Sequence, residues 1–256
     1  MVLPVVLMVL VALVALLAAA EAALPMPEYL KACSRNDPGL DECALRNGVA
    51  AIPHLLAGDR AYSIPPLDPL KIAEIRIEGA DSKAPTGLDI VYKDMTASGL
   101  DRAQLRSTHF DLKKKQMELS ILIPELRLVM QYEMDGKFLL LPIKGKGRET
   151  INMTDVDITY GLDYDLVTKP DGLEYMKPTD SRLKYKTTRM YLHLDNLFNG
   201  DKTLGENTNR FLNENWEAVD AEFGQVIAQA IGEVIKQIFS SCMDLVPYKD
   251  LFPESL

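Results

Sequence analysis

The sequence predicts an α+β fold in which one long apolar helix near the C-terminus packs against a large, curved antiparallel sheet. Apolar and polar residues alternate along much of residues 71–197, as is typical of half-buried strands. The clearest alternating run, Asp155 to Leu166, is about twice as long as an ordinary strand, which indicates a sheet that curls. Residues 206–239 repeat at helical spacing and carry a wide apolar stripe that needs an equally long cover.

The first 22 residues have the features of a secretory signal peptide. Met1 to Ala20 contain no charged side chain, and Ala20-Glu21-Ala22 is a small-residue site suited to signal peptidase. We therefore place the mature start at Ala23, and expect one domain over residues 23–256. Because no Lys or Arg precedes the apolar stretch, an uncleaved membrane anchor stays open as an alternative.

The charge balance excludes several classes of partner. The chain has 28 Lys and Arg against 37 Asp and Glu, a net charge of −9, and loss of Glu21 changes it to −8. An acidic chain repels phosphate backbones, and its densest basic cluster, Lys113 to Lys115, is better explained as a turn between strands, so we expect no nucleic-acid partner. No second apolar run approaches the ~20 residues of a membrane span. We expect a secreted, extracellular protein.

The N-terminal part of the mature chain combines a disulfide with a helix. Cys33 and Cys43 flank the turn-forming residues 36–39, so an exported chain is expected to pair them. Residues 41–57 have helical spacing, with a kink or an end predicted at Pro53 and a stop at Gly58. Cys242 is left over, either as a buried thiol or as an intermolecular link.

The central part is read as an extended proline-rich connector, residues 64–70, followed by strands. The apolar parity changes between Leu183 and Leu194, which predicts a bulge near Thr187 and Thr188. The segment around Gly145 and Gly147 is read as a hairpin turn. The final helix is expected to be continuous over residues 206–239, with glycines at 224 and 232 that allow close packing or leave room beside the helix.

Signals for catalysis are weak. The sequence lacks the G-x-S-x-G, H-E-x-x-H and P-loop motifs, so we predict no enzyme activity and no cofactor. His54, His109 and His193 lie in separate elements without paired ligand spacing, which argues against a metal site; His109 and His193 are expected to face outward. Asn152 begins a glycosylation sequon, but strand parity carried back from Val156 turns it toward the apolar face, so its occupancy stays open.

Four motifs resemble the insect takeout and haemolymph juvenile-hormone-binding family. They are Cys33 with the segment DECALRNG, the connector SIPPLDPLKI (63–72), the segment GKFLLLPIKGKG (136–147) and the segment HLDNLFNGDKTLGENTNRFLNENW (193–216) before the long helix. The resemblance covers nearly the whole mature chain. It implies a tubular lipid-binding-like fold, a strongly curved sheet around a long helix with an internal hydrophobic tunnel, and it agrees with the pairing of Cys33 and Cys43. The absence of a second cysteine pair favours the takeout-like branch.

The family implies a carrier of a small hydrophobic ligand in haemolymph or another extracellular fluid. The ligand could be juvenile hormone or another terpenoid, a fatty acid, or a similar lipid such as a quinone-like one. A secreted signalling or interaction protein without a cavity ligand is the alternative, and an unidentified receptor or target protein stays open. For a carrier, the ligand is expected between the helix stripe and the concave face of the sheet. The predicted contacts are Trp216, Val219, Phe223, Ile227 and Ile231 on the helix, and Tyr132, Tyr160 and Tyr164 on the sheet.

Overall fold

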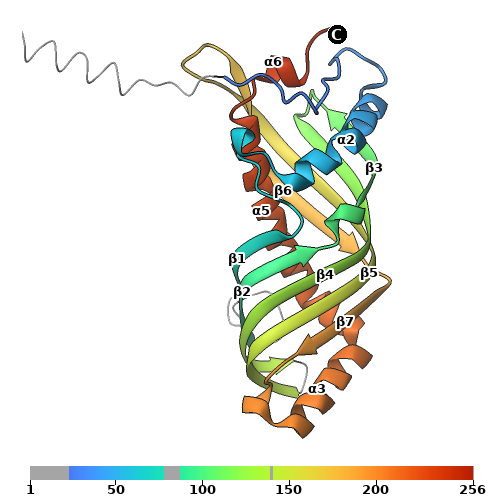
Figure 1. The fold of residues 1–256 in the computed structure, drawn as a ribbon, viewed down its shortest axis with the longest axis vertical. Coiled ribbons are helices and arrows are strands. Elements are labelled where there is room, and N and C mark those ends of the chain that lie inside the picture. Colours follow the sequence, from blue (N-terminus) through green and yellow to red (C-terminus); the bar gives the residue numbers. More distant parts are fainter. Residues whose placement is uncertain (1–22, 78–86, 139–140, 256) are drawn as a thin grey trace, which may run out of the picture.

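The structure, a computed structural model, describes residues 23–77, 87–138 and 141–255; the predicted signal peptide lies outside these ranges. The molecule is elongated, and one antiparallel sheet curls along the helix α5 (Figure 1). The described strands follow the order β1-β2-β4-β5-β6, with β3 beside β4 and β7 beside β5. Their bounds are β1 Leu70–Ile77, β2 Leu88–Ser98, β3 Gln104–Asp111, β4 Gln116–Phe138, β5 Leu141–Thr168, β6 Glu174–Lys186 and β7 Arg189–Leu194.

Helices close both ends of this curled sheet. Helix α2 and helix α6 lie at one end of the long axis, and helix α3 lies at the other (Figure 1). The α-helices are α2 Leu40–Ala57, α3 Lys202–Glu214, α4 Trp216–Val219, α5 Gln225–Met243 and α6 Tyr248–Leu251. Short 3-10 turns span Arg60–Tyr62, Leu100–Arg102 and Phe198–Gly200, and a π-helical turn spans Asp220–Gly224.

The two central strands are longer than the alternation predicted. Strand β4 has 23 residues and joins two runs that the sequence presents separately, and β5 has 28 residues. Gly145 and Gly147 lie inside β5, so the predicted hairpin turn at these glycines is wrong. A Cβ at Gly145 would lie 2.7 Å from the Tyr132 hydroxyl, and one at Gly147 would collide with the Asp195 carbonyl. Glycine is required here because another part of the chain passes directly against the strand.

A crease crosses three neighbouring strands. Ile123 pairs with Val156, and three residues further on Leu126 pairs with Met153; all four side chains face the interior. The intervening residues, including Pro124 and Asp155 with φ 48°, add one residue to each strand and exchange its faces.

The third strand changes at the same line. Strand β6 ends at Lys186 and β7 begins at Arg189, and the register with β5 is the same on both sides of this break. The face changes where the bulge was predicted, but as an interruption between two strands. The Thr188 amide donates to the Thr154 carbonyl at 3.0 Å and holds the break closed. The extra residue also turns Asn152 outward, so the inward orientation predicted for it was wrong.

The C-terminal helix is broken, in contrast to the continuous helix that was predicted. Helix α3 ends at Glu214, and Asn215 interrupts the helical path with φ −113° and ψ 28°. The amides of Asn209 and Asn213 bond with the backbone of Leu194 and Leu192, at 2.7 to 3.0 Å, and cover the exposed edge of β7. The first part of the helical segment is therefore fixed to a strand edge, whereas α5 packs across β6.

Close packing brings α5 against the sheet. A Cβ at Gly232 would lie 3.2 Å from Leu183 Cβ, and one at Gly224 would collide with the Tyr185 hydroxyl. Both glycines therefore serve the close approach, which was one of the two alternatives left open by the sequence. The Tyr160 hydroxyl donates to the Gly232 carbonyl at 3.4 Å and ties β5 to α5.

The predicted disulfide and helix form at the N-terminal end. The Cys33 and Cys43 sulfurs are bonded at 2.04 Å, which fixes the segment before α2 to its first turn. Helix α2 ends at Ala57 before Gly58, as expected, and passes through Pro53 without ending there. Cys242 is a free, half-buried thiol, and burial raises its pKa to about 11.

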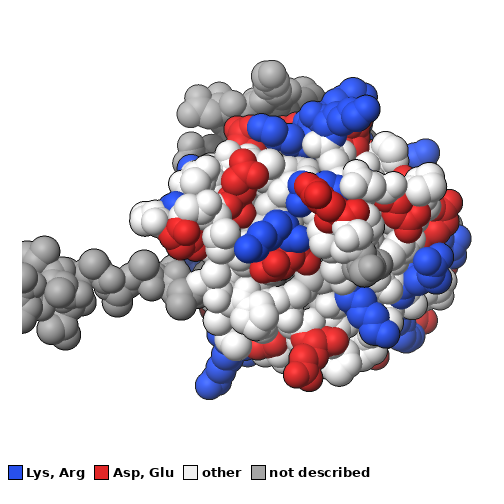
Figure 2. Space-filling model, turned by 90° about the horizontal axis from the view of Figure 1, so that it is seen from above, with Lys and Arg blue, Asp and Glu red and all other residues white. Residues whose placement is uncertain are grey.

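The surface carries mixed charge. On the end of the molecule seen in Figure 2, acidic and basic side chains alternate with uncharged ones. Outward-facing His109 and His193 each lie about 3 Å from an aspartate, Asp41 and Asp195 respectively.

None of the helices in the described ranges has the length and apolar content that a bilayer crossing requires. Within the same ranges, His, Cys, Asp and Glu do not gather in groups of three or more that suit a metal ion.

Candidate ligand cavity

An apolar cavity of about 550 Å³ lies between the helical segment and the concave face of the sheet. Its lining includes Leu30 and Ile52 near α2 at one end, and Leu194 and Leu212 near α3 at the other, so it extends along much of the long axis. The strands contribute Leu88, Ile90, Tyr92, Leu128, Met134, Phe138, Ile143, Ile151, Met153, Val156, Ile158 and Tyr160 among others. This volume lies within the range of small-molecule binding sites.

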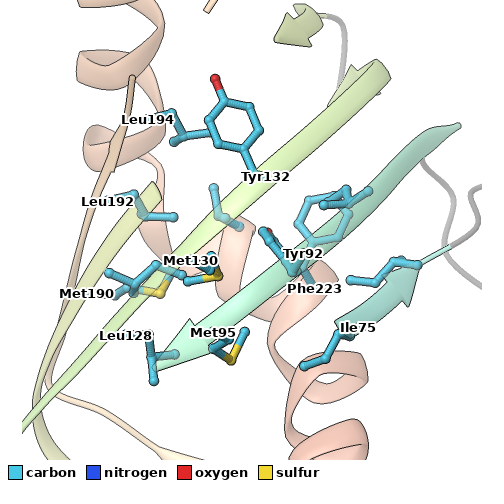
Figure 3. Packing of buried hydrophobic residues seen from close by; sticks show 14 of the residues in the cluster. Ile75, Tyr92, Met95, Leu128, Met130, Tyr132, Met190, Leu192, Leu194 and Phe223 are labelled. Atoms are coloured by element: carbon cyan, nitrogen blue, oxygen red, sulfur yellow. The ribbon is translucent and has the colours of Figure 1, made fainter. Parts of the chain in front are cut away.

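The alternation along the strands builds the cavity wall. Figure 3 shows side chains of β2, β4 and β7 pointing into one interior, together with Phe223 of the π-helical turn. The Phe223 ring lies 5.7 Å from the ring of Phe138, near the far end of β4. Successive residues of a strand face opposite sides, so every second side chain reaches the interior and the others face solvent.

Five of the eight predicted ligand contacts line the cavity. Val219, Phe223, Ile227 and Ile231 do so from the helical segment, and Tyr160 does so from β5. The four helical residues lie on the apolar stripe, and Tyr160 lies on the inner face of its strand, as the sequence predicted. Whether they contact a ligand stays a prediction.

The other three predicted contacts lie outside the lining. Trp216 follows the break at Asn215, is half-buried, and has the Arg189 guanidinium 5.6 Å from its ring. Trp216 nevertheless packs against the main apolar cluster, as the half-buried residues of the stripe do. Helical spacing predicted its place on the stripe, but spacing does not distinguish a residue that packs in the core from one that lines a cavity.

Tyr132 and Tyr164 are buried outside the cavity lining. The Tyr132 hydroxyl donates to the Asp195 carbonyl at 2.6 Å. It lies beside Gly145, where a Cβ would come within 2.7 Å of this hydroxyl. Tyr164 belongs to a separate cluster near α2 and α6, with its ring 6.5 Å from that of Tyr248. Their inward parity was predicted correctly, but neither lines the cavity.

A buried carboxyl group is the feature that the sequence reasoning missed. Glu149 on β5 lines the cavity and is only 2% exposed. Burial raises the pKa of its carboxyl to about 8, and a hydrogen bond with the Tyr92 hydroxyl partly opposes that rise. At neutral pH this group is therefore mainly an uncharged carboxylic acid. The available signal was the odd-numbered apolar set Ile151 and Met153, which places residue 149 on the inner face.

A second polar pair bridges the sheet and the helical segment. The Tyr185 hydroxyl donates to the Asp220 carboxylate, and both residues contribute to the cavity lining. Burial and this aspartate raise the pKa of Tyr185, so the phenol stays protonated. Because these two groups satisfy each other, Glu149 and Tyr92 form the more available polar site.

Comparison with known proteins agrees with this arrangement. The family model for haemolymph juvenile hormone binding protein matches residues 9–253. Circadian clock-controlled protein daywake of Drosophila yakuba is 26% identical over 238 residues, and that of Drosophila melanogaster is 25% identical over 237 residues. Each alignment covers 91% of this chain and 90% of the relative.

A solved structure has a similar fold. The crystal structure of takeout 1 from Epiphyas postvittana matches with a TM-score of 0.76 at 24% identity, and the match covers 88% of this chain and 100% of that one. This likeness supports the curled sheet and C-terminal helix predicted from the sequence. With the family match over nearly the whole chain, it leads to one assignment: the chain belongs to the takeout and haemolymph juvenile hormone binding protein family.

Proposed function

We propose that this protein is a secreted carrier that holds one small hydrophobic molecule in the cavity between α5 and the sheet. The observation that supports the proposal is the cavity itself. Protein interiors normally pack as densely as organic crystals, and destabilisation grows by roughly 24 cal/mol for each Å³ of cavity. A void of about 550 Å³ is therefore a large cost for plain core packing, whereas a bound ligand would offset it.

The lining indicates the chemical class of the ligand. Apolar side chains from both walls surround the space, so a terpenoid such as juvenile hormone, or a fatty acid, of about 15 to 20 carbons suits it. Transfer of an apolar chain from water supplies the driving force, which predicts affinity that depends little on salt. The chain belongs to a family of binding proteins, and its sequence lacks the catalytic motifs sought above. Both observations favour a carrier over an enzyme.

Native mass spectrometry of protein secreted from insect cells tests the proposal. We expect a bound species of lipid mass that organic extraction removes, and one-to-one rebinding of a C15 terpenoid by the stripped protein with a rise in melting temperature. Displacement of a fluorescent apolar probe is the suitable binding assay, because Trp216 lies outside the lining. A folded, stripped protein that binds no terpenoid or fatty acid at micromolar concentration would favour the alternative of a signalling protein without a cavity ligand.

The protein secreted from insect cells also tests the predicted signal-peptide cleavage site and the predicted glycosylation site. N-terminal sequencing of the secreted protein should begin at Ala23. Deglycosylation should change its mass if Asn152, whose side chain is exposed, carries a glycan.

A further inference from the structure

A buried carboxyl oxygen in the cavity lining lacks a hydrogen-bond partner within the described part of the chain. Glu149 Oε2 is buried and has no hydrogen-bond partner among the residues that the structure describes. Most buried polar atoms are paired, and an unpaired one destabilises the folded state. Since Glu149 lines the cavity, a bound molecule is in a position to supply the missing hydrogen bond.

The surroundings of Glu149 are apolar and uncharged. Its register partners are Met130 on β4 and Leu194 on β7, and Tyr92 hydrogen-bonds its carboxyl from β2. Tyr132 on β4 is the other titratable group near it, and burial keeps that phenol protonated. None of the ion pairs found within the described ranges involves Glu149.

Besides Glu149, the Asp, Glu, Lys and Arg side chains in the described part of the lining are Asp220 and Lys31. Asp220, on the helical side, accepts the bond of Tyr185, and Lys31 is exposed close to α2. Among the described residues, no cation pairs with this carboxyl group, which Tyr92 holds between Met130 and Leu194. It is therefore suited to donate its proton to a neutral oxygen.

We propose that Glu149, oriented by Tyr92, is the polar anchor of the cavity and selects lipids that carry one uncharged oxygen function on an apolar chain. An ester, ketone or epoxide oxygen accepts the Glu149 proton, and an alcohol exchanges a hydrogen bond with the carboxyl. A fatty-acid carboxylate would instead bring an uncompensated charge into an apolar space. This inference rests on the proposed carrier function and narrows its ligand class.

Three matched C15 probes test this selection: methyl farnesoate, farnesoic acid and farnesene, which differ at one end of a shared apolar chain. At pH 6.5 we expect the stripped wild-type protein to bind the ester about tenfold more tightly than the hydrocarbon, the magnitude of one good hydrogen bond, and to bind the acid more weakly than the ester. Glu149→Leu should bind farnesene at least as well as the wild type does and lose the preference for the ester.

Glu149→Gln separates the anchor from a packing effect. Its amide keeps a neutral donor, so it should retain the ester preference and hold it unchanged from pH 6.5 to 9.5. In the wild type, affinity for the ester should fall above about pH 8 as the carboxyl loses its proton. Farnesol should stay bound, because its hydroxyl donates to the ionised carboxylate. If Glu149→Leu does not fold, the comparison of Glu149→Gln with the wild type across pH still decides.

Glu133→Gln is the matched control, since Glu133 lies on the neighbouring strand, faces solvent and pairs with Lys146 at 3.1 Å. It should behave as the wild type with every probe. Equal wild-type affinity for ester and hydrocarbon, or an ester preference that survives in Glu149→Leu, would overturn the anchor and leave the carrier standing. Failure of all probes to bind the folded wild-type protein would instead overturn the carrier function.

Discussion

Glu149 carries a free-energy cost that depends on pH. Its carboxyl titrates at about 8 in the folded protein but near 4.5 when exposed. Between these values the unfolded chain has released the proton that the folded chain still binds, so the free energy of unfolding falls as pH rises. The decline should level off above about pH 8, once both states are ionised.

We predict that Glu149→Gln removes this decline. Denaturant unfolding at intervals from pH 4.5 to 9 should show similar stability for variant and wild type at the acidic end. As pH rises, the free energy of unfolding of the variant should increasingly exceed that of the wild type. At pH 9 the difference should reach about a few kcal/mol, as expected for a carboxyl whose pKa is raised by folding. Glu133→Gln should follow the wild-type curve, and parallel curves for Glu149→Gln and the wild type would contradict the assignment.

The helix wall offers a test of the cavity with one side chain. Ile227→Trp should fill part of the cavity from α5, lower the affinity for a C15 ligand at least several-fold, and leave the melting temperature unchanged or raised. Val226→Trp is the control, because Val226 is the adjacent residue on the same helix and is 36% exposed. Equal affinities for both variants would mean that ligands bind elsewhere.

The sequence predicted the helix wall well, because the stripe of Val219, Phe223, Ile227 and Ile231 depends only on helical period. The polar part of the site escaped prediction for a local reason. Parity carried back from Val156 passes through Asp155, whose positive φ inserts one residue and exchanges the two faces. Parity carried back in this way gives the outer face for position 149, although Glu149 lies inside.

At the level of elements, the strands were recognised but not their continuity. Apolar residues alternate over 117–123 and again over 126–134, yet the change of parity between the two runs looks the same as a chain reversal. In β4 it is a crease inside one strand, maintained by matching creases in its neighbours. The break of the C-terminal helix escaped for a similar reason, since the asparagines that fix α3 act through contacts with β7.

These asparagines provide a prediction. Asn213 accepts from the Leu192 amide at 3.0 Å and donates to the Leu192 carbonyl at 2.7 Å. Asn213→Ala leaves two backbone groups of an edge strand without these bonds and should lower the free energy of unfolding by about 1–3 kcal/mol. Asn207→Ala, on the exposed side of α3, should change it by less than about 0.5 kcal/mol. Hydrogen exchange should show faster exchange in β7 for the first variant only.

At the scale of the whole molecule, the sheet depends on the helical segment that it encloses. The main apolar cluster joins strand residues with Leu212, Val219 and Phe223, and the half-buried Ile227, Ile231 and Val234 pack against it. The helical segment therefore covers the concave face of the sheet, and the sheet needs this cover to bury its apolar side chains. Length alone would not predict this, because a sheet of this size often has a second sheet as its cover.

Truncation before Glu206 tests this dependence. Loss of large apolar side chains costs roughly 1.5 to 3 kcal/mol for each one buried. The cost of removing most of α3 and all of α4 to α6 should therefore exceed the ~5 to 15 kcal/mol that stabilises a domain. We expect the truncated chain to aggregate or to melt without a cooperative transition. A soluble fragment with a sharp thermal transition would contradict the architecture.

The crease at Pro124, Asp155 and Thr188 places a constraint on how relatives of this chain can change length. Deleting Asp155 alone would leave the extra residue in β4 and the break between β6 and β7 without a match in β5, and would disturb the pairing of β5 with both neighbours. Three deletions at once, one in each segment, would restore the pairing and remove the bend. Insertions and deletions along this line should therefore occur together in three segments far apart in the sequence, and an alignment of relatives should show them as a correlated set.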